Sequence, residues 1–590
     1  MRTPAAQPWA ERSAQPTAWT LLAHYLRPQL QRALILGALM LATVGLELSN
    51  PQILRAFIDS ATQGSTMDRL VTIAIVFLVV ALVTQIASVA ETYVAENVGL
   101  TATNALRADL TLHCLRLDPD FFTTHSPGEL IERVDGDVGL LANFFARFVI
   151  HVVGNCLLII GLIALLVQID WRVGAALAGV VLLGLLTMDR LHRVSVPRWA
   201  AARQASAEFF GFLEERLSGT EDIRASGATA YVMRGFYERS RRVIGKDLLA
   251  IVVGSIGIQS AGALLTIGGA LSIAVGGYLY LSGTITLGSV YLIFAYTQVL
   301  TRPIEQITRQ MQDLQVANAG LRRVRRLLGE RGSLIDGSHE LPSGGLSVDL
   351  EHVWFGYVAE DPVLRDLSLH LAAGQTLGVL GRTGIGKSTV ARLLLRLYDP
   401  SIGVIRLGGR DLRTVALTSL RDRVGMVTQE IQLFHASVRD NLSLFDTRVS
   451  DARMLTVLAE LGLDEWLARL PAGLDSRLAA DGAGMSAGEA QLLAFARVFL
   501  REPGLVILDE ASSRLDPATE RRIEQAIDRL LEGRTGIVIA HRLATLERVE
   551  QVLILDRQGV AEWGRRADLA ADPRSALSAL LSTGGQDLLA

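Results

Sequence analysis

A short glycine-rich run of the chain has the residue types and the spacing that hold the phosphate groups of a nucleotide. It consists of Gly381, Arg382, Thr383, Gly384, Ile385, Gly386, Lys387, Ser388 and Thr389, which fit the pattern G-x-x-x-x-G-K-S/T. Such glycines let backbone N–H groups close around phosphate oxygens, and the N-terminus of a following helix adds positive potential. In this chemistry Lys387 reaches the β- and γ-phosphates, and the Ser388 hydroxyl binds Mg²⁺.

Two carboxylates at the end of an apolar run form a second chemically competent group. The run Leu505–Leu508 is followed by Asp509 and Glu510. An apolar run of this kind predicts a buried parallel strand. Asp509 would then meet Mg²⁺, directly or through water, and Glu510 would polarise the attacking water. Because adjacent side chains on a strand point to opposite faces, the turn after the strand must redirect Glu510.

The glycine-rich run needs a strand before it and a helix after it. The apolar segment Gln375–Leu380 predicts the strand, and Thr389–Leu397 predicts the helix. A chance glycine-rich turn is the alternative, and the strand–loop–helix setting argues against it. The expected fold around these residues is an α/β domain with a P-loop.

Composition indicates that another part of the chain lies in a membrane. The chain has 590 residues, of which 50% are apolar, with a formal net charge of −3 and a mean hydropathy of +0.34. This length exceeds one domain, and the hydropathy is unusual for a soluble protein. The near-zero net charge argues against nucleic acid as a partner. Cys114 and Cys156 lack metal-ligand spacing, so packing roles are expected for both.

Six apolar-dominated stretches, each of roughly 20 residues or more, are long enough to cross a bilayer. They centre on Ala33–Leu54, Leu70–Ala90, Phe145–Val167, Ala175–Leu191, Ile251–Leu281 and Leu287–Val299. The second and fourth merge into polar sequence without a helix breaker, so their helices are expected to continue beyond the bilayer. The positive-inside rule puts the long basic connections and both termini in the cytoplasm.

Three ionisable residues, Glu47, Arg147 and His151, fall inside the predicted spans. Such residues are functional candidates by default, and a place on a substrate path is one interpretation of Glu47. An error in the span boundaries would move Arg147 into the cytosol, so the roles of all three stay open. Two polar turns, 118–129 and 217–224, interrupt the long connections and restart a helix.

Together these features resemble an exporter-type half-transporter of the ATP-binding cassette (ABC) superfamily. The resemblance extends from about residue 17 to 585 and is strongest from 346 to 545, where motif order and spacing both match. It implies a multi-domain membrane protein with an all-α, domain-swapped, six-helix transmembrane domain followed by an α/β P-loop nucleotide-binding domain. The expected divisions are a flexible N-terminus (1–16), the transmembrane domain (17–330), a linker (331–345) and the nucleotide-binding domain (346–590), with a helical subdomain at about 430–503.

The resemblance also implies roles for single residues. Tyr357 matches the aromatic residue that stacks on adenine, with a core tyrosine as the alternative, and Asp516 matches the loop that crosses to the partner domain. The implied cofactors are ATP and Mg²⁺, with the metal held by Ser388, Gln429 and Asp509. The implied catalytic residues are Lys387, Gln429, Glu510 and His541. The two polar turns match the coupling helices that dock on the nucleotide-binding domains.

One motif departs from the family. Met485-Ser486-Ala487-Gly488-Glu489 stands where the family has L-S-G-G-Q: Ser486 and Gly488 match, whereas the first glycine and the glutamine are replaced. In the family this signature covers the ATP held by the other subunit of a head-to-tail dimer. A methyl group at Ala487 restricts the backbone, and a carboxylate at Glu489 is expected to repel the nucleotide. Nearby, 479–482 lacks the usual glutamate, and Arg514 replaces a small residue.

The chain has the full set of hydrolytic residues, Lys387, Asp509, Glu510 and His541, but an altered signature. This combination predicts a heterodimer whose partner is a half-transporter with an intact signature. A homodimer with two slow sites is the alternative. The expected function is ATP-driven export of small hydrophobic or amphipathic drugs, lipids or peptides across the inner (plasma) membrane. Import of the siderophore type and nucleotide gating without transport remain alternatives, whereas six spans argue against a soluble cassette ATPase. The sequence does not specify the cargo.

Overall fold

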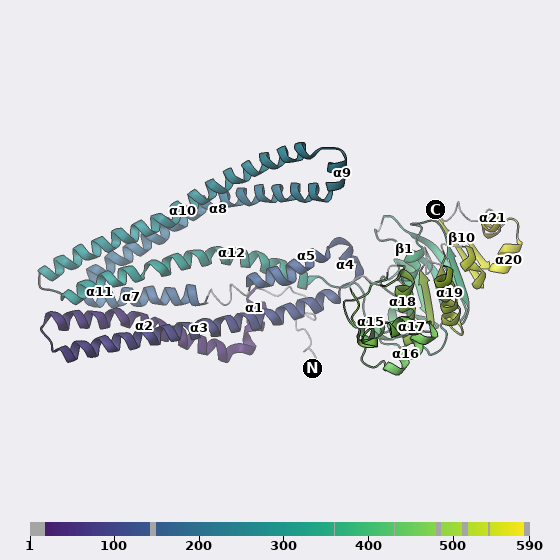
Figure 1. The fold of residues 1–590 in the computed structure, drawn as a ribbon, viewed down its shortest axis with the longest axis horizontal. Coiled ribbons are helices and arrows are strands. Elements are labelled where there is room, and N and C mark those ends of the chain that lie inside the picture. The colour runs from purple at the N-terminus through teal and green to yellow at the C-terminus, as the bar shows by residue number, and fades with distance from the viewer. Residues whose placement is uncertain are drawn as a thin grey trace. The chain divides into compact units, whose positions relative to one another are not determined.

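The computed structural model describes residues 18–141, 149–358, 360–429, 431–479, 485–509, 517–540 and 543–582. The chain divides into two compact units (Figure 1). The first comprises 1–117 and 125–331, and the second comprises 118–124 and 332–590. The short helix α4 (Pro119–Thr124), in the first of the two predicted polar turns, therefore groups with the second unit.

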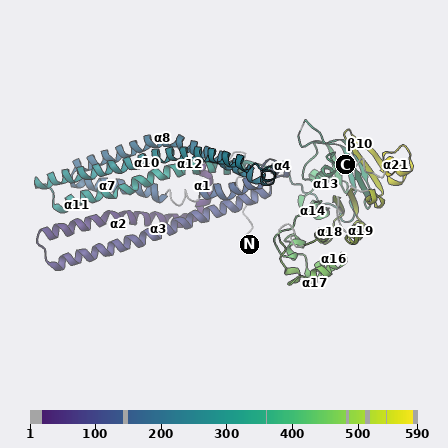
Figure 2. The ribbon, with the colours of Figure 1, turned by 45° about the horizontal axis from the view of Figure 1, so that its top comes forward.

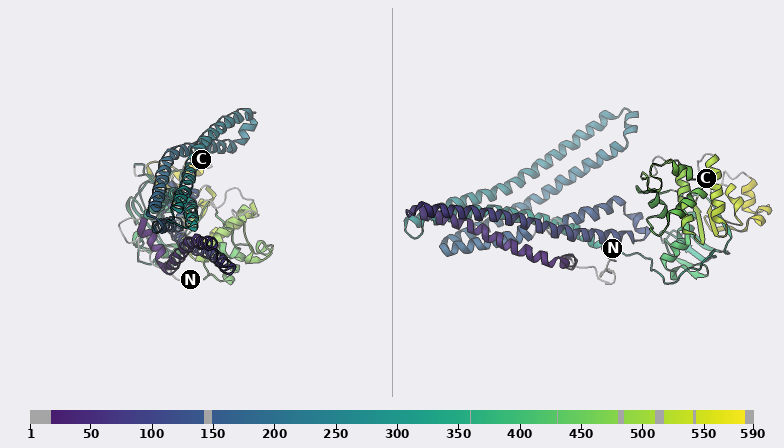
Figure 3. Two further views of the ribbon diagram at one scale, coloured as in Figure 1. Left: turned by 90° about the vertical axis from the view of Figure 1, so that its left-hand side faces the viewer. Right: turned by 60° about the horizontal axis from the view of Figure 1, so that its bottom comes forward.

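The described residues of the first unit are helical almost throughout. Its elements are α1 (Ala18–Leu26), η1 (Arg27–Gln29), α2 (Leu30–Thr62), α3 (Met67–Leu115), α5 (Pro127–Ile131), η2 (Glu132–Asp137), η3 (Val149–Gly154), α7 (Asn155–Ile169), α8 (Trp171–Ser218), α9 (Thr220–Ala225), α10 (Thr229–Leu281), α11 (Leu287–Val299) and α12 (Thr301–Gly329). Helices α2 and α3 lie side by side, and α8 and α10 form a second long pair (Figures 2 and 3).

Several helices are long and apolar enough to cross a membrane. Among the described residues these are Ala23–Thr62, Met67–Leu115, Val152–Ile169, Trp171–Ser218 and Gly262–Leu281, and Leu287–Val299 is a shorter apolar helix. Helix α3 runs unbroken for 49 residues and α8 for 48. At a rise of 1.5 Å per residue each extends about 70 Å, more than twice the roughly 30 Å hydrocarbon core. Both helices therefore continue beyond the bilayer, as their sequences predicted.

Helices α2 and α11 are joined at one end by a side-chain cap. The Asp59 carboxylate of α2 accepts the backbone N–H of Gly288 at 2.9 Å and the hydroxyl of Thr286 at 2.9 Å. A Cβ atom at Gly288 would lie 2.5 Å from the carbonyl oxygen of Arg55, so only glycine permits this approach. Asp59 therefore satisfies a free N–H group in the first turn of a neighbouring helix.

Further along the same pair, Tyr296 of α11 contacts the backbone of α2. Its buried hydroxyl donates to the carbonyl of Leu48 at 2.8 Å and accepts from the Gln52 amide at 3.0 Å. Pro51 lies inside α2 between these two residues. Because proline has no N–H, it removes one hydrogen bond of the helix at this point.

The described residues of the second unit form an α/β domain with two sheets. The six-stranded sheet has the order β10-β9-β3-β8-β7-β6, and the four-stranded sheet has the order β2-β1-β4-β5. The strands are β1 (Val348–Phe355), β2 (Leu364–Leu371), β3 (Thr376–Leu380), β4 (Ile402–Leu407), β5 (Arg410–Asp411), β6 (Val424–Val427), β7 (Leu505–Asp509), β8 (Thr535–Ile539), β9 (Gln551–Asp556) and β10 (Gly559–Arg565).

Helices cover the larger sheet and form a subdomain beside it. They are α13 (Lys387–Leu394), η4 (Leu412–Thr414), α14 (Leu417–Arg423), α15 (Val438–Ser443), α16 (Asp451–Glu460), α17 (Asp464–Ala468), η5 (Gly473–Asp475), α18 (Ala487–Arg501), α19 (Pro517–Leu531), η7 (Leu543–Arg548), α20 (Arg566–Ala571) and α21 (Ala576–Ser582). Strands β3, β7 and β8 are buried along their whole length. Strands β9, β3, β8, β7 and β6 are parallel, so their carboxyl ends meet at one edge, where ligands bind in such sheets.

Candidate functional site

The glycine-rich run connects β3 to α13, as predicted. Gly386 is the N-cap of α13 with φ of 108°, and a Cβ atom there would meet the Leu364 side chain at 2.9 Å. Lys387, the first residue of α13, is 5% exposed. Its ammonium group donates to the carbonyl of Gly381 and, at 3.2 Å, to that of Arg382. The loop therefore holds the lysine charge beside the backbone N–H groups that would surround phosphate.

Ser388 and Asp509 are brought together from separate motifs. The Ser388 hydroxyl donates to Asp509 Oδ2 at 3.2 Å, and Asp509 is buried at the end of β7. The other carboxylate oxygen, Oδ1, is also buried and has no hydrogen-bond partner. A buried polar atom without a partner is destabilising, and a bound cation removes that penalty. Hydroxyl and carboxylate oxygens are ligands that Mg²⁺ prefers, so these two residues fit a magnesium ion.

Tyr357 lies beside the P-loop helix within an aromatic cluster. Its hydroxyl is 3.2 Å from that of Thr389 and accepts from Arg392 at 2.8 Å. The rings of Phe355 and Tyr398 both pack against it edge-on, and burial raises the pKa of Tyr398, with Tyr357 adding to the effect. Tyr357 itself is 39% exposed, so its ring is available to stack on a base. Sequence reasoning missed Arg392, which belongs to no motif.

The remaining predicted site residues differ in how far the structure describes them. Gln429 is exposed and follows β6, whose Val427 pairs with Leu508 of β7. It therefore lies at the same edge of the sheet as Asp509. Glu510, Asp516 and His541 lie outside the described residues, as do Arg147 and Arg514, and the structure describes no side-chain surroundings for His151.

The altered signature forms the start of α18. Ser486 is the N-cap, its hydroxyl accepting the Glu489 N–H at 3.2 Å, and Glu489 Oε2 accepts the Ser486 N–H at 2.9 Å. This is a capping box, and the sequence pattern S-x-x-E could have predicted it. Ala487 is exposed and helical, so its methyl group causes no backbone strain. A Cβ atom at the buried Gly488 would lie 2.1 Å from Thr519 Cγ2 of α19.

An ion pair that no motif predicts involves the same glutamate. Arg469, which follows α17, donates to Glu489 Oε1 at 2.8 Å. The two residues are separated by twenty positions and by sequence without regular spacing, so no sequence pattern links them. The Glu489 carboxylate, which the sequence predicts will repel the nucleotide, is therefore paired with a positive charge.

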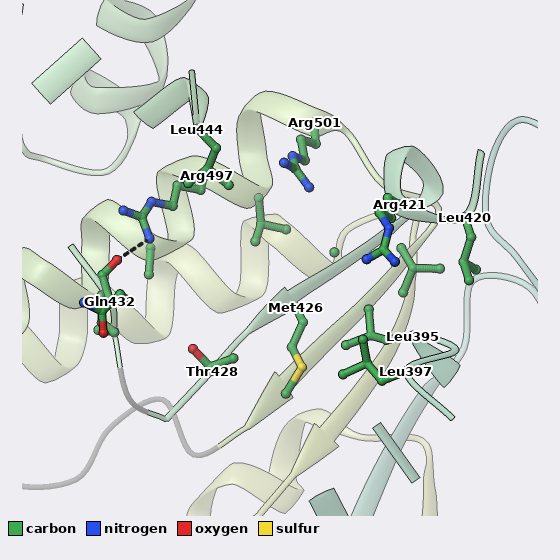
Figure 4. Close-up of a pocket in the computed structure, with 15 residues that line it drawn as sticks. Leu395, Leu397, Leu420, Arg421, Met426, Thr428, Gln432, Leu444, Arg497 and Arg501 are labelled. Carbon is green, nitrogen blue, oxygen red and sulfur yellow. Dashed lines mark hydrogen bonds between the residues drawn. The ribbon is translucent and has the colours of Figure 1, made fainter. Parts of the chain in front are cut away.

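A groove of about 270 Å³ lies between β6, α14 and α18 (Figure 4). Leu395 and Met426 contribute to its apolar lining, and Arg421 and Arg501 are exposed. Arg497 donates to the carbonyl oxygens of Asn441 at 2.7 Å and Gln432 at 2.9 Å. The groove therefore combines an apolar surface with positive charge.

Comparisons with known proteins agree with this architecture. Two family models match, one for the ABC transporter transmembrane region at 33–304 and one for ABC transporter at 364–513. The chain is 32% identical to the fatty acid ABC transporter ATP-binding/permease protein of Mycobacterium tuberculosis (strain CDC 1551 / Oshkosh), over 79% of this chain and 74% of that protein. It is 28% identical to the ATP-dependent lipid A-core flippase of Alcanivorax borkumensis, over 88% of this chain and 89% of that protein.

A solved structure has the same fold. A bacterial Atm1-family ABC exporter with ATP bound matches with a TM-score of 0.79 at 23% identity, covering 94% of this chain and 98% of that one. The predicted fold class, a helical transmembrane domain followed by an α/β nucleotide-binding domain, is thereby confirmed. The chain belongs to the ABC transporter family, as an exporter-type half-transporter that crosses the membrane several times and couples ATP hydrolysis to transport.

Proposed function

We propose that this chain is one subunit of a dimeric exporter that moves an amphipathic lipid, or a drug or peptide of similar character, out of the inner membrane. Its termini and its nucleotide-binding domain lie in the cytoplasm. The observation that supports the hydrolytic part is the Ser388–Asp509 pair, with one buried oxygen unpaired, at the same sheet edge as Lys387. The names of the relatives, which mention fatty acids and lipid A-core, favour lipid cargo.

The proposed mechanism assigns a task to each residue at that edge. Bound Mg²⁺ would offset negative charge on the phosphates, and Ser388 and Asp509 would hold it. Lys387 would exchange its bonds to the loop carbonyls for bonds to the β- and γ-phosphates. Glu510 and His541 would orient the water for in-line attack, because phosphoryl transfer depends on positioning and electrostatics.

The partner is proposed to be a half-transporter with an intact signature, because Met485–Glu489 lacks the first glycine and the glutamine of the family pattern. In that arrangement, ATP on this chain's P-loop meets the partner's signature and is hydrolysed. ATP on the partner's P-loop meets Met485–Glu489 and turns over slowly. A pair of identical chains with two slow sites is the alternative.

The test is ATP hydrolysis by the full chain, purified alone in lipid, beside its Glu510→Gln variant, with the particle mass recorded. Loss of hydrolysis in Glu510→Gln by about 10²-fold or more is expected if Glu510 is the general base. Turnover of the variant within tenfold of the wild type would contradict that role. Robust activity from a dimer of identical chains would contradict the heterodimer.

The lipid cargo needs a separate measurement. Proteoliposomes with fluorescent fatty acids or phospholipids are expected to show ATP-dependent movement that Glu510→Gln abolishes. Movement of a hydrophilic metal chelate instead, in the opposite direction, would favour the importer alternative.

A further inference from the structure

Glu489 brings a full negative charge into the first turn of α18. Helix α18 has 15 residues, and the N-terminus of such a helix has about half of a positive elementary charge. This positive end favours an anion such as phosphate. A unit negative charge in the same turn outweighs it, so an unpaired Glu489 would make the start of the helix net negative.

Both oxygens of Glu489 are engaged in the structure. Oε2 accepts the Ser486 N–H at 2.9 Å and the Ser486 hydroxyl at 3.1 Å. Oε1 accepts from Arg469 at 2.8 Å. The side chain of Glu489 is 24% exposed, whereas that of Arg469 is 70% exposed. The exposed Arg469 side chain therefore brings a positive charge next to a carboxylate that is fixed against the helix.

The surrounding motif is fixed independently of this ion pair. Met485 packs against the hydrophobic core, and Gly488 lies against Thr519 of α19 with no room for a side chain. Exposed ion pairs contribute little to folding stability, about 0–1 kcal/mol. Arg469 is therefore not required to build the motif, and its main effect is on the charge that the motif presents.

We propose that Arg469 is a positioning residue of the signature: it neutralises Glu489 and so allows Ser486 and the start of α18 to receive the nucleotide of the partner subunit. The proposal rests on the proposed function, in which this motif covers an ATP molecule in a dimer. With the carboxylate charge compensated, the Ser486 hydroxyl can turn from Glu489 toward a phosphate oxygen. The altered signature can then still bind ATP, because Arg469 compensates the negative charge of Glu489.

The test measures ATP occlusion by two copies of the full-length chain in one lipid nanodisc, where the motif of each copy can cover ATP on the other. The Glu510→Gln background is used so that hydrolysis does not limit retention. The readout is the MgATP concentration that half-saturates retention of radiolabelled ATP through gel filtration. The variants are Arg469→Gln, Glu489→Gln and the double variant. Arg453→Gln is the matched control, because Arg453 pairs with Glu502 at 2.6 Å beyond the opposite end of α18.

Arg469→Gln is expected to raise the half-saturating concentration by about three- to fivefold, which is the upper part of the range of an exposed charge pair. In the presence of Glu489→Gln the same substitution is expected to change it by less than about twofold, since no charge remains to compensate. Added salt should reduce the effect of Arg469→Gln, and Arg453→Gln should have none.

Two results would overturn the proposal: no effect of Arg469→Gln, or an equal effect with and without Glu489→Gln. The thermal unfolding midpoint of each variant separates misfolding from altered binding. Absence of ATP retention in every form, the Arg453→Gln control included, would count against ATP binding at this motif between identical chains, and it would agree with the heterodimer of the proposed function.

Discussion

Asp509 presents one oxygen to Ser388 and keeps the other buried without a hydrogen bond. In a folded core such an atom is rare, because desolvation of a carboxylate oxygen is unfavourable unless something replaces the lost water. The unpaired oxygen of Asp509 therefore favours binding of a cation where the P-loop and β7 meet.

Asp509→Asn is predicted to reduce Mg²⁺-dependent hydrolysis by at least about 10²-fold. A neutral amide is a weaker ligand for Mg²⁺ than a carboxylate, so the buried position would attract the cation less. ATP hydrolysis against Mg²⁺ concentration is the measurement. Ser388→Thr keeps a hydroxyl and serves as the control, with activity near that of the wild type. Full activity of Asp509→Asn at ordinary Mg²⁺ concentrations would exclude Asp509 as a metal ligand.

Tyr357 allows ring and hydroxyl contributions to be separated. Tyr357→Ala is predicted to weaken ATP binding by about 1–3 kcal/mol, the usual value of base stacking, as measured by titration with a fluorescent nucleotide. Tyr357→Phe removes the bonds to Thr389 and Arg392 but keeps the ring, so its affinity should stay close to wild type. If Tyr357→Ala bound ATP normally, Tyr357 would be only a packing residue.

At this scale the motifs predicted which residues meet and not how their charges are balanced. Lys387, Ser388 and Asp509 belong to patterns whose geometry follows from phosphate and metal chemistry. The pairing of Arg469 with Glu489 depends on how the helical subdomain folds back on itself, which no local spacing encodes.

At the scale of the elements, the close contact of α18 with α19 depends on Gly488, which has no side chain. Gly488→Ala would place a methyl carbon 2.1 Å from Thr519 Cγ2, so one helix must shift. A loss of about 1–3 kcal/mol is predicted, as for other overpacked contacts, and a lower thermal midpoint would report it.

Thr519→Ser provides the matched test of that cause, since it removes the methyl group that Gly488→Ala would meet. The double variant Gly488→Ala/Thr519→Ser is predicted to recover most of the lost stability. If it did not recover, the glycine would be needed for a reason other than this contact.

The elements were predicted from sequence where periodicity or a motif was strong. The strand Gln375–Leu380 and the long extensions of the second and fourth spans correspond to β3, α3 and α8. The predicted helix Thr389–Leu397 instead runs from Lys387 to Leu394, because Gly386 caps it earlier. The six-residue π-helical segment η2 gave no sequence signal, since its hydrophobic pattern does not differ from that of an α-helix.

At the scale of the whole transporter, transport requires that ATP hydrolysis be coupled to a conformational change of the membrane helices. Helix α9 presents the exposed acidic residues Glu221 and Asp222, and the groove of the nucleotide-binding domain presents Arg421 and Arg501. From the family resemblance we predict that a coupling helix such as α9 docks on a nucleotide-binding domain of the dimer, where opposite charges would favour the correct register.

Glu221→Lys/Asp222→Lys is therefore predicted to abolish the stimulation of ATP hydrolysis by cargo while basal hydrolysis stays within about twofold, because the ATP site itself is unchanged. Cargo-stimulated hydrolysis in nanodiscs is the measurement. Adding Arg421→Glu should restore part of the stimulation. Normal stimulation in the α9 variant would rule out charge pairing as the basis of docking.

Tyr296 gives α2 a mechanical property that its own sequence does not provide. Pro51 leaves α2 with a gap in its hydrogen bonds, and the Tyr296 hydroxyl holds the carbonyl of Leu48 beside that gap. While α11 stays in place, the hydrogen bond from Tyr296 stabilises α2 against bending at this point. If α11 moved away, this hydrogen bond would be lost, and α2 would bend most easily at Pro51. The stiffness of one helix is thus set by the position of its neighbour.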